Sequence, residues 1–142
     1  MMSNDCRRLL IVEDNPTDVM VLRRAIREHG LSVEIAVVED GDQAINYLQE
    51  CRGDKIPHLV VIDINLPKRD GIEVLRKCRF SPWLVQTKTL VFTSSDEQSD
   101  HHRSELLGVD AYMRKPIRLD DFTAVVGTIR RLLESTDMQP AA

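Results

Sequence analysis

The stretch that decides the fold is residues 59–71, LVVIDINLPKRDG. It opens with four consecutive apolar residues, which is typical of a strand with both faces buried in a parallel sheet. The strand ends on a carboxylate, Asp63, and a turn with Pro67 and Gly71 follows. An isolated buried carboxylate is costly, and open α/β sheets place their chemistry at the carboxyl ends of the strands. We therefore expect Asp63 to be the reactive residue.

On either side of this stretch, apolar runs alternate with helical patterns. Four further strands are expected at residues 7–12, 33–38, 88–92 and 108–113. The helical patterns fall at residues 16–29, 41–51, 70–80, 96–107 and 119–133. Parallel neighbours need crossover connections, which are usually helices. The sequence therefore predicts an α/β fold with a doubly wound five-stranded parallel sheet, in the order 2-1-3-4-5 along the chain.

The first helix has clear signals at both ends. Asn15 is a good N-cap, Pro16 suits the first helical position, and Gly30 is expected to stop the helix. The third helix is expected to begin near Asp70. The final helix carries an apolar stripe that we expect to begin at Leu119.

The fourth helix has weaker signals. Ser95 with Gln98, or Ser94 with Glu97, could form a capping box at its start. Its apolar face rests mostly on residues 106–107, so we expect it to pack less firmly than the other helices.

The composition indicates one globular domain. The chain has 142 residues, of which 42% are hydrophobic and 30% charged, with a formal net charge of −4. The negative charge argues against a nucleic-acid partner, and neither a membrane span nor a signal peptide is evident, so we expect a cytoplasmic protein. Three cysteines without C-x-x-C spacing indicate free thiols. The domain is expected to span residues 7–134, between tails at 1–6 and 135–142.

Polar side chains end four of the five predicted strands: Glu13 and Asp14, Asp63, Thr93, and Lys115. In the predicted strand order, three carboxylates meet in one pocket beside a hydroxyl and an ammonium group. Such carboxylates repel each other unless a cation intervenes, and a set of oxygen ligands favours Mg²⁺, or Mn²⁺, over zinc. The formal charges of the three acids, Lys115 and a divalent ion then sum to zero.

In order and approximate spacing, these residues resemble the response regulator receiver domain, a flavodoxin-like fold shared with chemotaxis regulators. The resemblance covers residues 7–134 and includes Thr93-Ser94-Ser95, Tyr112 and Lys115-Pro116. The blocks at residues 12–18 and 63–67 are similar to single-domain regulators that are paired with phytochrome-type histidine kinases.

The resemblance implies a role for each acidic residue. Asp63 would be the phosphoacceptor. Asp14 and Asp63 would bind the metal ion, Glu13 would help mostly through water, and the backbone carbonyl of Asn65 would add a ligand. Asn65 and Ser95 occupy positions that would tune hydrolysis of the phosphoryl group.

The resemblance also implies a phosphoryl-binding and switch group. Lys115 would pair with the phosphoryl oxygens, and Thr93, followed by Ser94, would move to hydrogen-bond them. Tyr112 would switch between outward and inward rotamers. The peptide bond between Lys115 and Pro116 would be cis and would aim the lysine at the site.

Taken together, the resemblance implies a stand-alone response regulator of a two-component phosphorelay. It would accept phosphate from a histidine kinase and signal by protein contact through the fourth helix, fifth strand and fifth helix. The same face would serve in a homodimer. No multiple-turnover substrate is expected.

Two other classes of protein fit the sequence less well. A Mg²⁺-dependent phosphatase with an aspartate nucleophile usually carries a second acid two residues after the nucleophile, where this chain has Asn65. A flavodoxin-like cofactor binder would need a phosphate-cradling loop after the first strand. Glu13 and Asp14 stand there instead and would repel phosphate.

Overall fold

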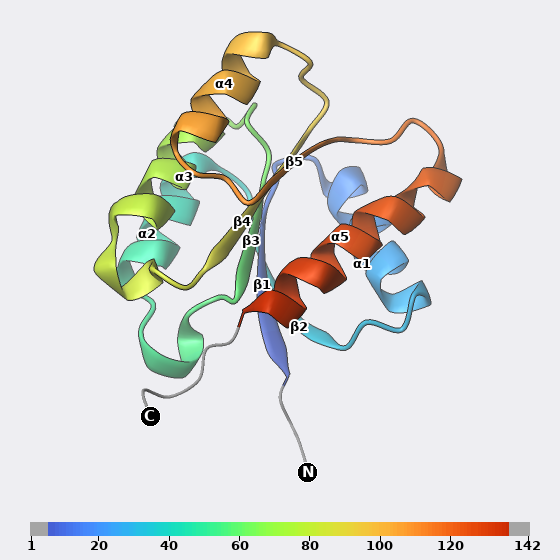
Figure 1. The fold of residues 1–142 in the computed structure, drawn as a ribbon, viewed down its shortest axis with the longest axis horizontal. Helices are drawn as coiled ribbons and strands as arrows, with labels where there is room; N and C mark the ends of the chain where they lie inside the picture. Colours follow the sequence, from blue (N-terminus) through green and yellow to red (C-terminus); the bar gives the residue numbers. More distant parts are fainter. Residues whose placement is uncertain (1–5, 137–142) are drawn as a thin grey trace.

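A computed structural model describes residues 6–136 of the chain. Five parallel strands form one sheet in the order β2-β1-β3-β4-β5, which confirms the predicted topology (Figure 1). The strands are β1 Arg7–Val12, β2 Val33–Val38, β3 Leu59–Ile62, β4 Lys88–Thr93 and β5 Ala111–Arg114. The helices are α1 Pro16–Glu28, α2 Gly41–Glu50, α3 Gly71–Phe80, α4 Gln98–Leu106 and α5 Phe122–Ser135.

Helices cover both faces of the sheet. Helices α1 and α5 lie on one face, and α2, α3 and α4 lie on the other (Figure 1). Alternate residues of β1 serve the two cores, because side chains along a strand point to opposite faces. Leu9 and Ile11 pack in the α1–α5 core, and Leu10 and Val12 pack in the α2–α3 core. The central strands are therefore buried on both sides, as their apolar runs predicted.

The predicted cap of α1 is confirmed, and α3 begins beside Asp70 as predicted. The Asn15 side chain accepts hydrogen bonds from the backbone N–H groups of Thr17 and Asp18. The Asp70 side chain accepts one from Glu73 N at 3.1 Å. Gly30 follows the C-cap of α1 with a φ of 71°, a left-handed conformation that favours glycine. These caps fix where α1 and α3 leave the carboxyl edge of the sheet.

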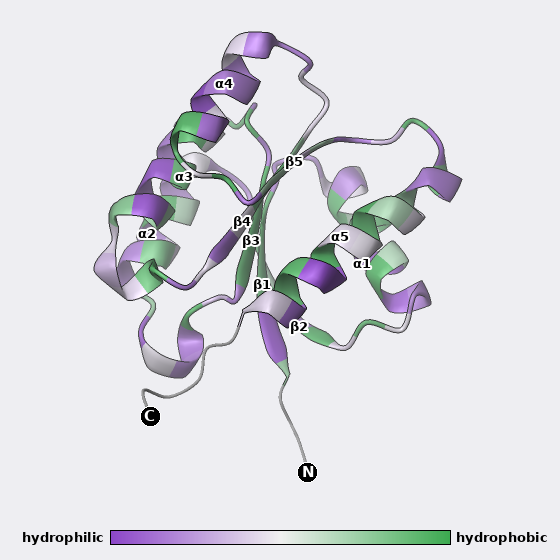
Figure 2. Cartoon of the chain, viewed as in Figure 1, coloured by the Kyte–Doolittle hydropathy of each residue, from purple (hydrophilic) through white to green (hydrophobic). Residues whose placement is uncertain are grey.

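Helix α4 differs from the prediction. Glu97 is its N-cap and makes no side-chain capping bond, while the Ser95 hydroxyl donates to Asp100 Oδ2 at 2.8 Å instead of completing a capping box. The buried residues of α4 are Asp100 and Ser104, and Leu106 is 72% exposed. Figure 2 shows a largely hydrophilic helix. Its inner side is held by polar contacts, which hydrophobic periodicity does not reveal.

The prediction that the apolar stripe of the final helix begins at Leu119 is also wrong. Leu119 lies in a short 3-10 segment, Leu119–Asp121, and is 72% exposed, because α5 begins only at Phe122. At the other end, α5 includes Ser135, and Thr136 is buried. The remainder of the predicted tails, residues 1–5 and 137–142, lies outside the described residues. Among the helices that are described, none is long and apolar enough to span a bilayer.

Candidate phosphoryl-transfer site

Two buried acids directly follow neighbouring strands. Strands β1 and β3 pair in parallel, and their last residues, Val12 and Ile62, are opposite each other. Glu13 N donates to Val38 O at 3.0 Å, and Asp63 N donates to Val12 O at 3.1 Å, so each acid continues the backbone pairing of its strand by one residue. The sheet register therefore places both carboxylates at the same edge.

Asp14 completes a cluster of three carboxylates. One carboxylate oxygen from each of Glu13, Asp14 and Asp63 lies within 4.8 Å of the others. Glu13 and Asp63 are buried, whereas Asp14 is exposed. Burial raises the pKa of Glu13 to about 7, and the charge of Asp63 adds to this effect, although a hydrogen bond from Lys115 opposes it. The convergence of the three acids occurs where the sequence predicted it.

Lys115 holds its ammonium group among these acids. Its backbone N–H donates to Thr93 O at 2.8 Å, so the lysine continues the pairing of β5 with β4. Lys115 Nζ lies 2.7 Å from Glu13 Oε1, 2.8 Å from Asp18 Oδ2 and 2.9 Å from Asp63 Oδ2. Burial alone would lower the pKa of Lys115, but hydrogen bonds to Asp18, Asp63 and Glu13 outweigh it and raise the pKa above its ordinary value. Lys115 is therefore charged at neutral pH.

The peptide bond between Lys115 and Pro116 is trans, contrary to the expectation that it would be cis. Within residues 6–136 no peptide bond is cis. The trans form is intrinsically favoured before proline by about 0.5–1 kcal/mol, and with it the Lys115 ammonium still reaches Asp63.

Asp18 is the site residue that sequence reasoning missed. It lies in the first turn of α1, where an acid is usually explained by the helix dipole alone. Its position four residues after Asp14, on the helix that leaves the same edge of the sheet, was the available signal. With Asp18, the site holds four carboxylates and one ammonium group, so its formal charge is −3 and a divalent ion would bring it to −1, not to zero.

The two hydroxyl-bearing residues Thr93 and Tyr112 contact the segment that leads into α4. Thr93 is fully buried, and its Oγ1 accepts a hydrogen bond from Ser95 N at 3.2 Å. Tyr112 OH donates to Ser95 O over 3.4 Å, and the Tyr112 ring stacks on His101 of α4 with ring centroids 4.4 Å apart. Ser94 is exposed. Thr93 and Tyr112 are thus joined through the segment that leads into α4.

The residues present suit a hard divalent cation. The three clustered groups are carboxylates, and the cluster contains no histidine or thiolate ligand. Asp63 Oδ1 accepts a hydrogen bond from Asn65 N at 3.1 Å, which fixes the carboxylate in the cluster. Three carboxylates beside one ammonium group leave a formal negative charge that a divalent cation would offset. Glu13, Asp14 and Asp63 could hold Mg²⁺ or Mn²⁺, with the Asn65 carbonyl as the further expected ligand.

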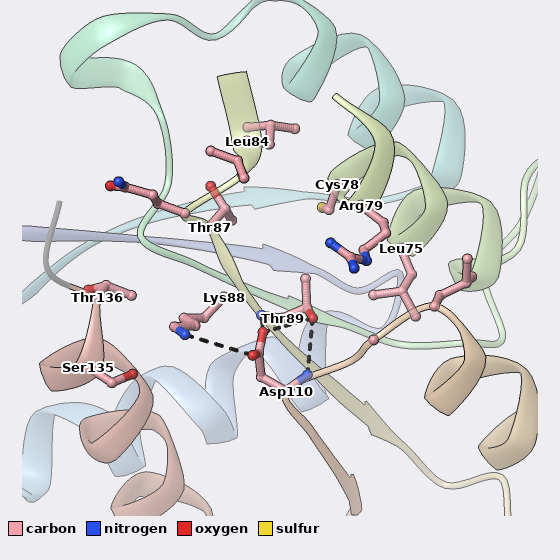
Figure 3. A pocket seen from close by; sticks show the side chains of 14 residues that line it. Leu75, Cys78, Arg79, Leu84, Thr87, Lys88, Thr89, Asp110, Ser135 and Thr136 are labelled. Atoms are coloured by element: carbon pink, nitrogen blue, oxygen red, sulfur yellow. Dashed lines mark hydrogen bonds and ion pairs between the residues drawn. The ribbon is translucent and has the colours of Figure 1, made fainter. Parts of the chain in front are cut away.

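A separate pocket lies at the opposite end of the sheet. It has a volume of about 350 Å³ and is lined by residues of α3, the start of β4 and the turn before β5, among them Lys88 and Asp110 (Figure 3). Asp110 already accepts a hydrogen bond from Thr89 N at 2.8 Å and pairs with Lys88. Cys78 also lines the pocket, and complete burial raises the pKa of its thiol to about 12. These groups face the amino ends of the strands and take no part in the acidic site.

Comparisons with known proteins agree with this geometry. A sequence model of the response regulator receiver domain matches residues 9–127. Response regulator Rcp1 of Synechocystis sp. PCC 6803 is 32% identical over 143 aligned positions, which cover 99% of this chain and 97% of Rcp1. The crystal structure of the phosphorylated cyanobacterial phytochrome response regulator RcpA has a TM-score of 0.82 and 30% identity, covering 96% of this chain and all of RcpA. The Mn²⁺-bound form of Rcp1 has a TM-score of 0.80 and 30% identity, covering 95% and 99% of the two chains. The chain belongs to the response regulator receiver family.

Proposed function

We propose that the chain is a phosphorylation-controlled switch that receives a phosphoryl group on Asp63 from the phosphohistidine of a kinase. The observation that carries this proposal is the position of Lys115 Nζ, 2.9 Å from Asp63 Oδ2 at the carboxyl edge of the sheet. A lysine there can hold a phosphoryl oxygen beside the acceptor carboxylate. Cyanobacterial phytochrome response regulators are among its relatives, which supports a histidine kinase of the phytochrome type as the partner.

In the proposed transfer, a carboxylate oxygen of Asp63 attacks phosphorus, and the bond from phosphorus to the kinase imidazole breaks. The imidazole leaves with the electron pair and takes up a proton. The Asn65 N–H holds Asp63 Oδ1 in place, while Lys115 and Thr93 stabilise the equatorial oxygens in the transition state. A divalent ion bound by Glu13, Asp14 and Asp63 would supply the positive charge that the acidic cluster lacks.

The output is proposed to leave through α4, β5 and α5. A phosphoryl group on Asp63 adds a charge of about −1.5 to −2 at the site. Thr93 and Tyr112 both contact Ser95, whose hydroxyl binds Asp100 on the polar inner side of α4. A helix held by a few polar contacts can shift more easily than one held by an apolar stripe. The face it forms with β5 and α5 would then bind a partner or a second copy of the chain.

Removal of divalent cations is expected to reduce phosphorylation of the purified protein by acetyl phosphate to background. The four carboxylates of the site together with Lys115 carry a formal charge of −3 and repel an anionic phosphoryl donor. Labelling after EDTA treatment, followed by addition of Mg²⁺ or Mn²⁺, measures the effect, and circular dichroism checks that the fold persists. Labelling at an undiminished rate in EDTA would contradict the charge argument.

The same preparation separates a switch from a phosphatase. A switch takes up at most one phosphoryl group per chain and shows no sustained turnover of small phosphate esters such as p-nitrophenyl phosphate. Asn65, two residues after Asp63, offers no acid or base for such turnover. Sustained hydrolysis that depends on Asp63 would show that the protein is a phosphatase and would contradict the proposed switch.

A further inference from the structure

The ammonium group of Lys115 is shared among three carboxylates. It donates hydrogen bonds to Asp18 and Asp63 at 2.8 and 2.9 Å and forms an ion pair with Glu13 at 2.7 Å. A phosphoryl oxygen that approaches Lys115 therefore competes with carboxylates that are already bound to it. The strength of this competition determines how readily Lys115 can bind the phosphoryl group.

Two of the three partners are anchored in the buried site. The side chains of Glu13 and Asp63 are only 6% and 7% exposed, and each accepts a second hydrogen bond, from Asn15 N and Asn65 N respectively. They belong to the acid cluster that would hold the metal ion.

Asp18 differs from both. It stands outside that cluster, and its side chain is 37% exposed. Its backbone is fixed by a hydrogen bond to the N-cap Asn15, and the helix dipole favours its negative charge. It therefore stands beside Lys115 independently of the acid cluster.

We propose that Asp18 restrains phosphorylation by competing with the phosphoryl group for the ammonium of Lys115. The inference rests on the proposed function of Asp63 and adds a positioning residue to it. Asp18 keeps Lys115 drawn toward α1 and cancels part of its charge. The phosphoryl group thus meets a weaker electrostatic partner than the lysine alone would provide.

Asp18→Asn is expected to accelerate labelling by acetyl phosphate about threefold to fivefold at saturating Mg²⁺, a factor typical of one partly exposed charge pair. The affinity for beryllofluoride, a stable mimic of the phosphoryl group, should rise by a similar factor in calorimetric titration. Asp18→Glu keeps the charge and should restore the slow rate. Asp42→Asn is the matched control, because Asp42 also lies in the first turn of a helix but pairs with Arg69, not with Lys115.

A double substitution tests whether Asp18 acts through Lys115. In a Lys115→Ala background, Asp18→Asn should bring no acceleration, because the contested ammonium is gone. The inference is overturned if Asp18→Asn gives the same gain in the Lys115→Ala background. It is also overturned if Asp18→Asn leaves the labelling rate of the otherwise wild-type protein unchanged or lowers it. Wild-type protein that takes no label at all would instead refute the proposed function, so the two failures are distinguishable.

Discussion

Replacing Asp63 by Asn is expected to abolish phosphorylation by acetyl phosphate or by a cognate kinase. The amide oxygen is not a competent nucleophile for phosphorus, whereas the carboxylate is. Asn has nearly the same size and can still accept the hydrogen bond from Asn65 N, so the loop after β3 should keep its shape. Removing one negative charge from the acid cluster also relieves repulsion, and we expect the folded state to be no less stable than in the wild type.

The measurement is incorporation of labelled phosphate at saturating Mg²⁺, with unfolding in urea as the test of stability. Asp54→Asn provides the control, because Asp54 is exposed in a short 3-10 segment away from the acidic cluster. That variant should be labelled like the wild type. Undiminished labelling of a folded Asp63→Asn protein would remove Asp63 from the mechanism.

Gly71→Ala is expected to destabilise the protein by about 3 kcal/mol, the upper part of the range for overpacked sites. A Cβ at position 71 would lie 2.3 Å from the backbone oxygen of Asp63 and 2.7 Å from the Cα of Ile64. These are backbone atoms of the loop that carries the phosphoacceptor, and Gly71 N also donates to Ile64 O at 2.9 Å. The loop cannot yield without moving Asp63, so phosphorylation should fall together with stability.

Urea unfolding followed by circular dichroism measures this effect. Gly127→Ala is a matched control in the interior of α5, where an added Cβ meets nothing within 4 Å. Because alanine is the better helix former, that variant should be more stable by up to about 1 kcal/mol. If both alanine variants were as stable as the wild type, the close packing of Gly71 against Asp63 would be refuted.

The sequence could predict those parts of the fold that depend on local chemistry. The apolar runs located the strands, and Asn15 and Asp70 marked helix starts, because a side chain that caps a helix bonds to backbone only two or three residues away. The acid cluster was also predictable, because parallel strands bring their carboxyl ends to one edge of the sheet.

Features that depend on contacts between distant segments could not be predicted. Asp100 is buried in α4 because Ser95 donates to it, so the polar inner side of the helix has no hydrophobic pattern. Asp18 meets Lys115 across 97 residues of sequence, and apart from its spacing from Asp14 nothing local distinguishes it from an ordinary acid in a first helical turn. Leu119 fits the α5 stripe by spacing, but a 3-10 segment turns it outward.

The most direct test of the central claim is to locate the phosphoryl group on the wild-type protein. The acyl phosphate can be trapped by borohydride reduction after labelling in Mg²⁺, and the modified residue identified by peptide mass spectrometry. We predict that the modification lies on Asp63 alone. Modification of Glu13, Asp14 or Asp18 in place of Asp63 would contradict the assignment of the acceptor and the roles given to the acids around it.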